Sequence, residues 1–227
     1  MLRPAEHPAR RLSRVLERLG TTFVKLGQGV GLRRDLLPDE YIAALEGLQD
    51  HVAPFPGHIA VAEITRALGA PPGELFATFD ETPLAAASIA QVHGARLKNG
   101  TEVVVKVRRP DIRRQVTQDI RLLRLTIRGL SWMLPFLSRY QLLDVIDEAE
   151  QDLRREMDFR EEARSMQRFG EAFRDSPTIY IPLVFADLSA DSVLVQARSG
   201  GQRVDSASLG EQGPALAQAL VSAYLHQ

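Results

Sequence analysis

Residues 85–108 read AAASIAQVHGARLKNGTEVVVKVR, and this stretch decides the fold. Asn99-Gly100 is a strong signal for a tight hairpin turn, because both residues accept the positive φ angles that such a turn needs. The runs on either side, 89–97 and 102–108, have the composition of strands. In the second run, valines at every other position share one face and Lys106 lies on the opposite face. The stretch therefore predicts two antiparallel strands with one apolar face.

The segments around this hairpin extend it into a mixed fold. Residues 75–79 predict a strand before it, and residues 179–184 and 192–196 predict two strands after it. Residues 159–173 predict an amphipathic helix between these groups of strands. Three strands, a helix and two more strands follow the order of a kinase small lobe. We therefore expect an α+β fold, a kinase-like small lobe with a five-stranded antiparallel sheet plus helix.

The pattern also divides the chain into parts. Residues 1–74 predict an amino-terminal helical extension, and residues 75–199 the small lobe. Within that lobe we expect inserted helices at about 111–157. Residues 200–227 predict a linker, marked by two glycines, and the first helix of a large lobe.

The composition is that of an ordinary globular protein, and it excludes several kinds of site. The chain has 227 residues, of which 44% are hydrophobic and 25% charged, enough to bury a substantial core. Its formal net charge of −1 gives no basis for nucleic-acid binding. The absence of cysteine excludes disulfides, thiol nucleophiles and cysteine zinc sites, and the five histidines show no metal-ligand spacing.

No stretch of the sequence is long enough to span a membrane. The most apolar one, residues 129–137, contains Pro135 and is far shorter than the roughly 20 residues of a spanning helix. We expect this stretch to form a buried or interfacial helix end. Residues 1–18 are rich in arginine but lack the apolar run and cleavage site of a signal peptide.

Lys106 is the first candidate for chemistry. A lysine on a mostly apolar strand must find an anion or reach water. It is either an ammonium that reaches nucleotide phosphates or an edge-strand lysine that discourages aggregation. Glu162 favours the phosphate reading, because it falls within the apolar stripe of helix 159–173, and a carboxylate on a core-facing stripe needs a cation. The alternative is an acid at the edge of the stripe that turns toward water.

Four small residues fill the predicted turn between the first two strands: Ala85, Ala86, Ala87 and Ser88. Main-chain N–H groups in such a turn can approach phosphate oxygens closely, and the serine adds a hydroxyl. An alanine run is equally typical of a tight packing segment, so both interpretations stay open on these residues alone.

Two further groups of polar residues lie outside the strands. Lys25 and Gln28 are three residues apart on a predicted helix and therefore share a face. Glu156 and Asp158 supply two acids just before the helix that carries Glu162. Asp158 also fits a capping role at the start of that helix, which would explain it without any chemistry.

Together these features resemble the UbiB/AarF kinase-like family. The matching motifs are residues 25–28 (KLGQ), 85–93 (AAASIAQVH), 103–110 (VVVKVRRP) and 156–163 (EMDFREEA). They are similar to the family's KxGQ motif, its alanine-rich loop, its phosphate-lysine strand, and its ExD motif with the helix glutamate. The resemblance runs in the family's order from about Leu19 to Gln227.

The resemblance implies an ATP site. Lys106 would contact the nucleotide phosphates and pair with Glu162, and the loop from Ala85 to Ser88 would cover the phosphates. The adenine hinge would fall at Val195, Gln196 and Ala197. The family's hinge usually reads methionine then glutamate, and here those positions are glutamine and alanine. Because backbone groups provide most of the recognition there, this departure is compatible with adenine binding.

The resemblance also implies a regulated site. Lys25 would point into the site and pair with Glu156 or Asp158, and Gln28 would crowd the place where a protein substrate would dock. The family's Ala-Asp-Pro-His-Pro-Gly-Asn loop and Asp-Phe-Gly motif do not occur up to Gln227. The catalytic and metal-binding residues are therefore expected beyond it, with the large lobe missing and Mg²⁺ expected for the complete domain only.

The function implied is that of an atypical kinase or ATPase that supports ubiquinone biosynthesis or related lipid metabolism. Its partners would be a nucleotide and lipid or quinone-pathway proteins, without nucleic acid. It would be cytoplasmic, with peripheral association at the inner membrane compatible with the sequence. The alternative function is a non-catalytic pseudokinase fragment that binds a partner, a lipid or a membrane.

Overall fold

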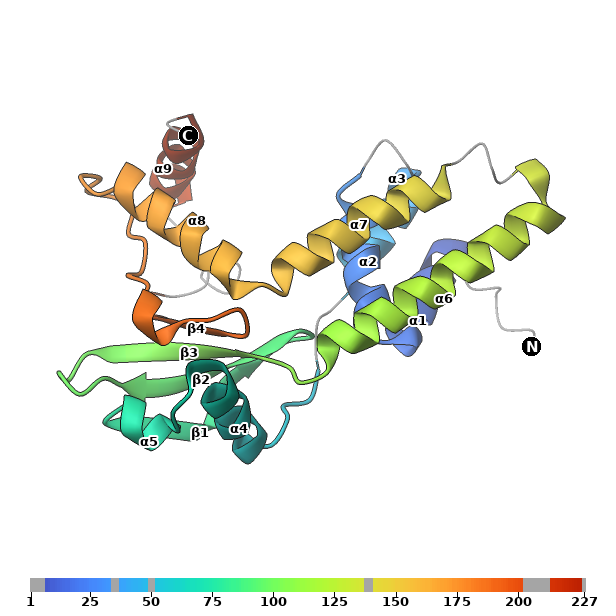
Figure 1. The fold of residues 1–227 in the computed structure, drawn as a ribbon. Helices are drawn as coiled ribbons and strands as arrows, with labels where there is room; N and C mark the ends of the chain where they lie inside the picture. The colour runs from blue at the N-terminus through green and yellow to red at the C-terminus, as the bar shows by residue number, and fades with distance from the viewer. Residues whose placement is uncertain (1–6, 34–36, 49–51, 137–140, 202–212, 226–227) are drawn as a thin grey trace, which may run out of the picture.

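The computed structural model describes residues 7–33, 37–48, 52–136, 141–201 and 213–225. It is an α+β structure, and its described part holds one antiparallel sheet in the order β1-β2-β3-β4 (Figure 1). The elements before the sheet are α1 (Pro8–Leu19), α2 (Thr21–Gly31), α3 (Asp39–Glu46), α4 (Gly57–Leu68) and α5 (Pro72–Leu75). The strands are β1 (Thr78–Ala86), β2 (Ala90–Arg96), β3 (Glu102–Arg108) and β4 (Val193–Ala197). The remaining helices are α6 (Ile112–Met133), α7 (Leu142–Glu156), α8 (Phe159–Ala172), the 3₁₀ helix η2 (Ala186–Leu188) and α9 (Gly213–Leu225).

The predicted hairpin is present as β2 and β3. The two strands pair along their whole length, from Ala90 opposite Arg108 to Arg96 opposite Glu102. Gly100 in the turn has a φ of 88°, in the left-handed region that glycine adopts without strain. The three alternating valines of β3 are fully buried. The predicted strands, turn and buried face are therefore confirmed.

Helices cover both faces of the sheet. On the valine face, Ile64 of α4 packs into a core with Phe76 and the buried valines. On the opposite face, Leu194 of β4 shares a core with Phe159 of α8. Figure 1 shows α4 below the sheet and α8 above it. The face that carries Lys106 therefore lies toward α8.

The prediction of five strands is wrong by one. Residues 179–184 form no strand, and only Val184 makes an isolated bridge, opposite Gln196. Two further backbone hydrogen bonds join this segment to β4, from Ala197 N to the carbonyl of Leu183 and from Phe185 N to the carbonyl of Val195. Pro182 provides no N–H group for a ladder, which explains why the segment runs beside β4 without extending the sheet.

The first strand begins later than predicted. Leu75 belongs to α5, which starts with Pro72 at its first position, and β1 runs from Thr78 to Ala86. Proline is favoured at the first position of a helix because its fixed φ suits the helix and its missing N–H is not needed there. The alanine run is therefore divided: Ala85 and Ala86 lie in β1, and the turn begins at Ala87.

The amino-terminal extension is a small bundle of α1, α2 and α3. Val24 of α2 packs in a core with Leu45 and Leu48. Gly27 allows this close packing, because a Cβ at its position would lie 2.6 Å from Leu48 Cδ1. Thr22 then fastens the bundle to the inserted helices, with its Oγ1 donating to Asp119 Oδ2 at 2.5 Å.

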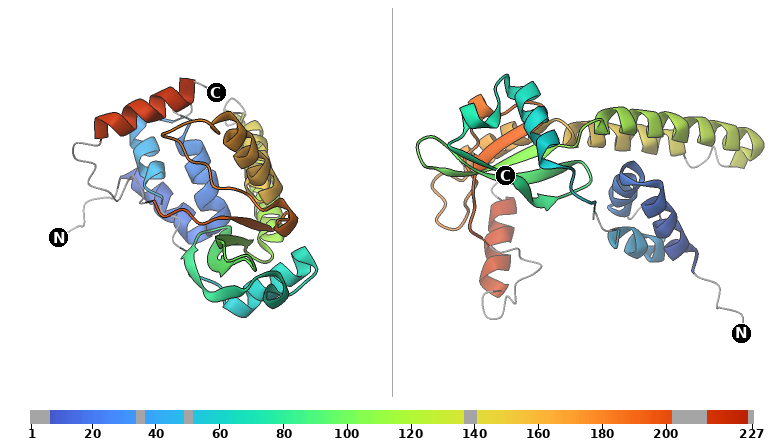
Figure 2. Two further views of the ribbon diagram at one scale, coloured as in Figure 1. Left: turned by 90° about the vertical axis from the view of Figure 1, so that its left-hand side faces the viewer. Right: turned by 90° about the horizontal axis from the view of Figure 1, so that it is seen from below.

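The residues predicted as a helical insertion form two helices, α6 and α7, which pack side by side (Figure 1). Figure 2 shows this pair projecting well away from the sheet. Their inner sides join a core with α8. The apolar residues near the far end of α6 are exposed, so 132–136 do not form a buried helix end, and the interfacial alternative stays a prediction. No helix in the described ranges has both the length and the apolar character needed to cross a bilayer.

Candidate functional site

An ion pair between β3 and α8 lies at the centre of the candidate site. Lys106 Nζ lies 2.7 Å from Glu162 Oε2, and the two side chains are 28% and 39% exposed. The register of the sheet places Lys106 between Val92 of β2 and Leu194 of β4, which leaves its side chain on the face toward α8. The ammonium is therefore held in place by a carboxylate and yet remains accessible from solvent.

The first turn of α8 contacts this ion pair through Phe159. Phe159 is fully buried, and Lys106 Nζ lies 4.7 Å from the centroid of its ring. Such a contact stabilises an ammonium on the ring face. Phe159 N also donates to the carbonyl of Asp191, next to β4. Because Glu162 follows Phe159 by about one turn, the same helix start positions both partners of Lys106.

Asp158 is the N-cap of α8 and does not pair with Lys25. Its Oδ1 accepts from Arg160 N at 3.2 Å, and its carboxylate also pairs with the Arg160 guanidinium at 3.0 Å. Hydrogen bonds from Arg160 lower the pKa of Asp158, against a smaller opposing effect of burial. The capping role considered from the sequence is therefore present, and the carboxylate is ionised at neutral pH.

Arg109 binds the turn at Ala87 and Ser88 through hydrogen bonds to the carbonyls of these two residues. Its Nε donates to the carbonyl of Ser88 at 3.2 Å, and its Nη2 donates to the carbonyl of Ala87 at 3.3 Å. The same Nη2 donates to the carbonyl of Ala53 at 3.0 Å. Ser88 is fully buried. With these carbonyls engaged by one guanidinium, the turn is held in a fixed shape beside β3.

The predicted hinge residues lie at the end of β4. Val195 is fully buried, and Gln196 and Ala197 are half-buried. Gln196 pairs with Val104 in the sheet, so its side chain shares the face of Lys106. Its Oε1 is buried and has no hydrogen-bond partner among the described residues. A buried acceptor without a donor costs free energy, so this oxygen is suited to accept a hydrogen bond from a ligand.

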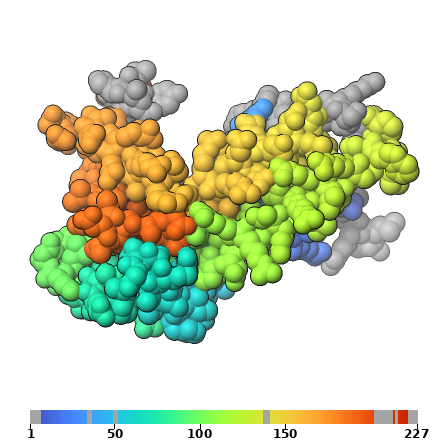
Figure 3. Space-filling model, viewed as in Figure 1, coloured from blue at the N-terminus to red at the C-terminus, as the bar shows by residue number. Residues whose placement is uncertain are grey.

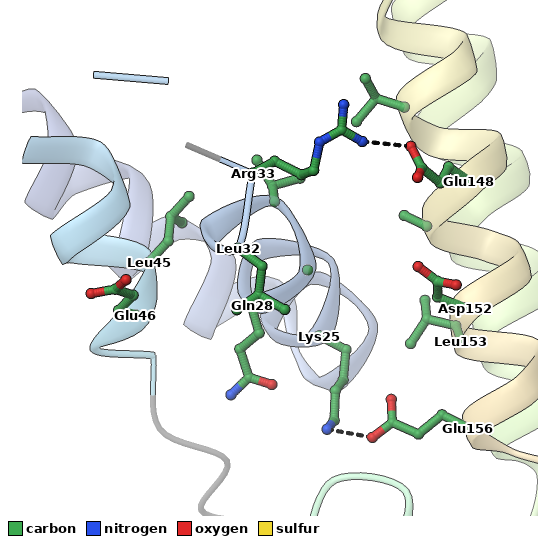
Figure 4. Close-up of a pocket in the computed structure, with 14 residues that line it drawn as sticks. Lys25, Gln28, Leu32, Arg33, Leu45, Glu46, Glu148, Asp152, Leu153 and Glu156 are labelled. Carbon is green, nitrogen blue, oxygen red and sulfur yellow. Dashed lines mark hydrogen bonds and ion pairs between the residues drawn. The ribbon is translucent and has the colours of Figure 1, made fainter. Parts of the chain in front are cut away.

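A groove of about 580 Å³ separates α2 from α7 (Figure 4). Lys25 Nζ lies 2.6 Å from Glu156 Oε1, and Arg33 Nη1 lies 2.8 Å from Glu148 Oε2. Figure 4 shows these two ion pairs crossing the groove, with Asp152 between them on α7. Of the two acids that the sequence offered as partners of Lys25, the structure brings Glu156 to it.

Gln28 lies on the same side of α2 as Lys25 (Figure 4). Its Nε2 donates to the carbonyl of Leu48 at 3.0 Å. This bond ties α2 to the end of the segment that carries α3. The glutamine therefore also has a structural role within the amino-terminal extension.

Two arginines of the site were not recognised from the sequence as anchors. Arg108 is 7% exposed, and its guanidinium donates to the carbonyls of Met157 and Asp191 and to the Asp191 carboxylate. Burial lowers the pKa of Arg108, although the group stays charged at any physiological pH. Their position in the sequence could have indicated this role. Arg108 and Arg109 lie at the end of the lysine strand, within reach of both the turn at Ala87 and the junction between α7 and α8.

No three histidine or acidic side chains in the described ranges are grouped to hold a metal ion. The described residues therefore provide no cluster of three such ligands for Mg²⁺. The face that carries Lys106 holds its ammonium, the Glu162 carboxylate that pairs with it and the buried amide oxygen of Gln196, a set that suits an anionic ligand with a hydrogen-bond donor.

Comparison with known proteins agrees with this arrangement. Residues 47–227 match the ABC1 atypical kinase-like domain family. The chain is 42% identical over 212 residues to the "Probable protein kinase UbiB" of Tolumonas auensis, a match that covers 92% of this chain and 39% of that protein. It is 41% identical over 214 residues to the protein of the same name from Vibrio vulnificus, covering 92% and 39%. The chain thus spans about two fifths of these relatives.

A solved structure is also similar. It is the complex of Rv3197 with erythromycin from Mycobacterium tuberculosis, with a TM-score of 0.58 and 31% sequence identity. The match covers 76% of this chain and 44% of that one. The UbiB relatives are similar to this chain over most of its length. The lysine strand, the helix glutamate and the family match agree, and the chain belongs to the ABC1 atypical kinase-like family.

Proposed function

We propose that this chain binds the phosphates of ATP through Lys106 and forms the nucleotide-binding part of an atypical kinase or ATPase. The observation that carries the proposal is the ion pair of Lys106 with Glu162, at 2.7 Å on the accessible face of the sheet. Kinases use such a pair to aim a strand lysine at the α- and β-phosphates. A lysine that only discouraged aggregation at an edge would need no such partner, and β3 is an inner strand of the sheet.

The remaining groups would have separate tasks. Glu162 holds the ammonium in position before the nucleotide arrives. The turn from Ala87 to Ser88, with Ala85 and Ala86 leading into it, covers the phosphates, while the Ala87 N–H is used within the turn by the carbonyl of Ala90. At the other end, Val195, Gln196 and Ala197 lie beside the adenine.

The side chain of Gln196 favours adenine over other bases at this site. Its Oε1 is a buried acceptor without a partner in the described part of the chain. The exocyclic amine of adenine is a donor that this oxygen could accept from. A base that offers a carbonyl oxygen instead would bring two acceptors together, which is unfavourable in a buried place.

Lys25 and Glu156 form a contact that would regulate the site. Their ion pair joins the amino-terminal extension to the last residue of α7, three positions before Phe159. Gln28 lies on the same side of α2 (Figure 4). We infer that this contact controls how closely the extension approaches the nucleotide and any second substrate.

The relatives named UbiB suggest the process that the chain serves. We propose that it supports ubiquinone or related lipid metabolism, with lipid or quinone-pathway proteins as partners. Since the chain spans only about two fifths of those relatives, turnover depends on residues for catalysis and Mg²⁺ that the described part does not supply.

The test is a binding titration of this chain with a fluorescent ATP analogue, competed with unlabelled ATP. We expect weak but saturable binding, reduced about tenfold or more by Lys106→Ala, because charge-assisted hydrogen bonds to phosphate are lost. The matched control is Lys98→Ala, an exposed lysine near the hairpin turn, which should leave the affinity unchanged. Equal affinities for the wild type and Lys106→Ala would contradict the proposal, as would competition by inorganic phosphate alone.

A further inference from the structure

The far end of α6 and the residues after it carry a cluster of exposed large apolar side chains. They are Leu122, Leu125, Leu130, Trp132, Met133, Leu134 and Phe136. Trp132 is 85% exposed and Met133 is 69% exposed. Figure 3 shows this end of the helix pair projecting away from the sheet. Contiguous apolar side chains on the surface of a soluble protein mark a contact with something else.

Three arginines follow the same side of the helix. Arg114, Arg121 and Arg128 are seven residues apart, and seven residues fall only about 20° short of two full turns. Leu125 and Trp132 lie within the same narrow sector, each four residues after an arginine. We call these five residues the outer face of α6. The buried residues of the helix, such as Val116 and Ile120, lie on the opposite side.

The outer face is strongly positive. None of Arg114, Arg121 and Arg128 has an ion-pair partner among the residues that the structure describes, whereas Arg124 pairs with Asp147 and Glu150 of α7. The whole of α6 contains five arginines and one acid. That acid is Asp119, which accepts a hydrogen bond from Thr22 on the inner side. The chain as a whole has a net charge of −1, so this concentration of positive charge is local.

The chemistry of this face restricts what covers it. A second copy of the same face would bring three unpaired arginines against three, which is repulsive. A nucleic acid would match the charge but would leave Trp132, Met133 and Phe136 without an apolar partner. An anionic lipid surface matches both, because arginine can keep its charged group at the headgroups while its stem and the neighbouring apolar side chains enter the interface.

We propose that the outer face of α6, together with the exposed Met133 and Phe136, docks on an anionic membrane surface. The helix of 22 residues, about 33 Å long, would lie in the plane of the interface. Trp132 would sit at the level of the headgroups, where tryptophan is favoured. The acidic helix α7 lies on the other side of α6, so the pair presents its positive side to the lipid. This surface is separate from the Lys106 site and does not depend on nucleotide binding.

Trp132 provides a direct test, because it is the single tryptophan of the chain. The experiment titrates the full chain with vesicles of phosphatidylcholine alone or with a large fraction of phosphatidylglycerol, and follows the tryptophan emission. We expect a blue shift and protection from a soluble quencher with the anionic vesicles only. Lipids brominated near the headgroup should quench the emission, which reports insertion without any variant. An unchanged spectrum with anionic vesicles overturns the proposal.

Variants then locate the contact. Replacing Arg114, Arg121 and Arg128 together by Gln should weaken vesicle binding by roughly 10- to 100-fold, since each basic residue near an anionic surface adds to the attraction. The matched control replaces Arg10, Arg11 and Arg18 of α1 by Gln, which removes the same charge from another exposed helix and should leave binding within about twofold. Equal losses for the two triple variants would mean a general charge effect and would overturn the assignment to α6.

Apolar substitutions distinguish insertion from charge attraction alone. Met133→Ser with Phe136→Ser keeps Trp132 as the reporter and should reduce binding at high salt, where electrostatic attraction is screened. Tyr180→Ser with Leu183→Ser is the control, because those side chains are similarly exposed near β4. Binding that is insensitive to the first pair at high salt, or equally sensitive to both pairs, rejects the insertion of this helix end.

Discussion

Arg108 Nη1 donates to the carbonyl oxygen of Met157 at 2.6 Å, and this bond fastens the lysine strand to the junction between α7 and α8. Met157 lies between Glu156 and Asp158, and it is itself buried. The strand that carries Lys106 and the helix start that positions Glu162 are therefore joined by one buried side chain. The two halves of the candidate site are held together before any ligand binds.

Arg108→Met should destabilise the fold strongly. The substitution keeps the apolar volume but takes the donor from the Met157 carbonyl and leaves the Asp191 carboxylate with Arg113 as its remaining partner, and an unsatisfied buried polar group costs about 1–3 kcal/mol. Urea unfolding measures this loss in the free energy of unfolding. Arg96→Met is the control, because the Arg96–Glu102 pair is 54% exposed on both sides, and it should cost less than about 1 kcal/mol. Similar losses for the two variants would contradict the anchoring role of Arg108.

Gln196→Leu should change stability and ligand binding in opposite directions. Removing a buried acceptor that has no partner among the described residues should raise the free energy of unfolding by about 1 kcal/mol. The same change removes the acceptor proposed for adenine, so affinity for the ATP analogue should fall roughly three- to tenfold. Thermal unfolding and a binding titration give the two quantities.

The control for Gln196 is Gln151→Leu on the exposed side of α7, which should alter neither quantity. If Gln196→Leu lowers stability and leaves the affinity unchanged, its amide has a structural partner and no role in recognising the base. If both quantities fall together, the loss of affinity reflects a damaged fold, and the proposed hydrogen bond to adenine is rejected.

The sequence predicted those features of the site that depend on local periodicity. The hairpin follows from Asn99-Gly100 and alternating valines. The position of Glu162 on an apolar stripe indicates that it needs a cation, and the family resemblance implies that this cation is Lys106, a contact present at 2.7 Å. The need for such a partner can be predicted because a charged side chain on a core-facing stripe is unfavourable unless an opposite charge lies beside it.

Features that depend on tertiary contacts were not predicted. Residues 179–184 have strand composition, but Pro182 and the neighbouring turns leave only one bridge to β4. The apolar residues 132–136 have the composition of a buried segment, yet the helix pair extends past anything in the described structure that could cover them. Arg109 is an anchor because the turn at Ala87 folds back beside it, a contact that its position after the lysine strand does not by itself specify.

His93 should make stability depend on pH in mildly acidic solution. Burial lowers the pKa of His93 from its ordinary value of 6.5. Its neighbours require the neutral ring: Gln91 Nε2 lies 2.9 Å from His93 Nε2, and the Gln91 Oε1 accepts from Phe55 N, so the amide donates and the ring nitrogen must accept. The other ring nitrogen then donates to the carbonyl of Asp80 at 2.8 Å.

The direction of this pH dependence follows from proton binding. Above about pH 6.5 the imidazole is neutral in both states, and its contribution to stability is fully present. As the pH falls below that value the unfolded chain takes up a proton that the folded chain resists, so the free energy of unfolding decreases by up to about 1.4 kcal/mol per pH unit. The decrease continues until the lowered pKa of the folded state is reached.

Urea unfolding of the wild type and His93→Phe between about pH 5 and 7 tests this directly. The phenylalanine keeps a ring stacked near Phe79, which lies 5.1 Å from His93 between ring centroids. The variant should be less stable at pH 7, because Gln91 and the Asp80 carbonyl lose a partner, but its stability should vary less with pH than that of the wild type. His58→Gln, at an exposed histidine of α4, should keep the full pH dependence. An unchanged slope in His93→Phe would place the titrating group elsewhere.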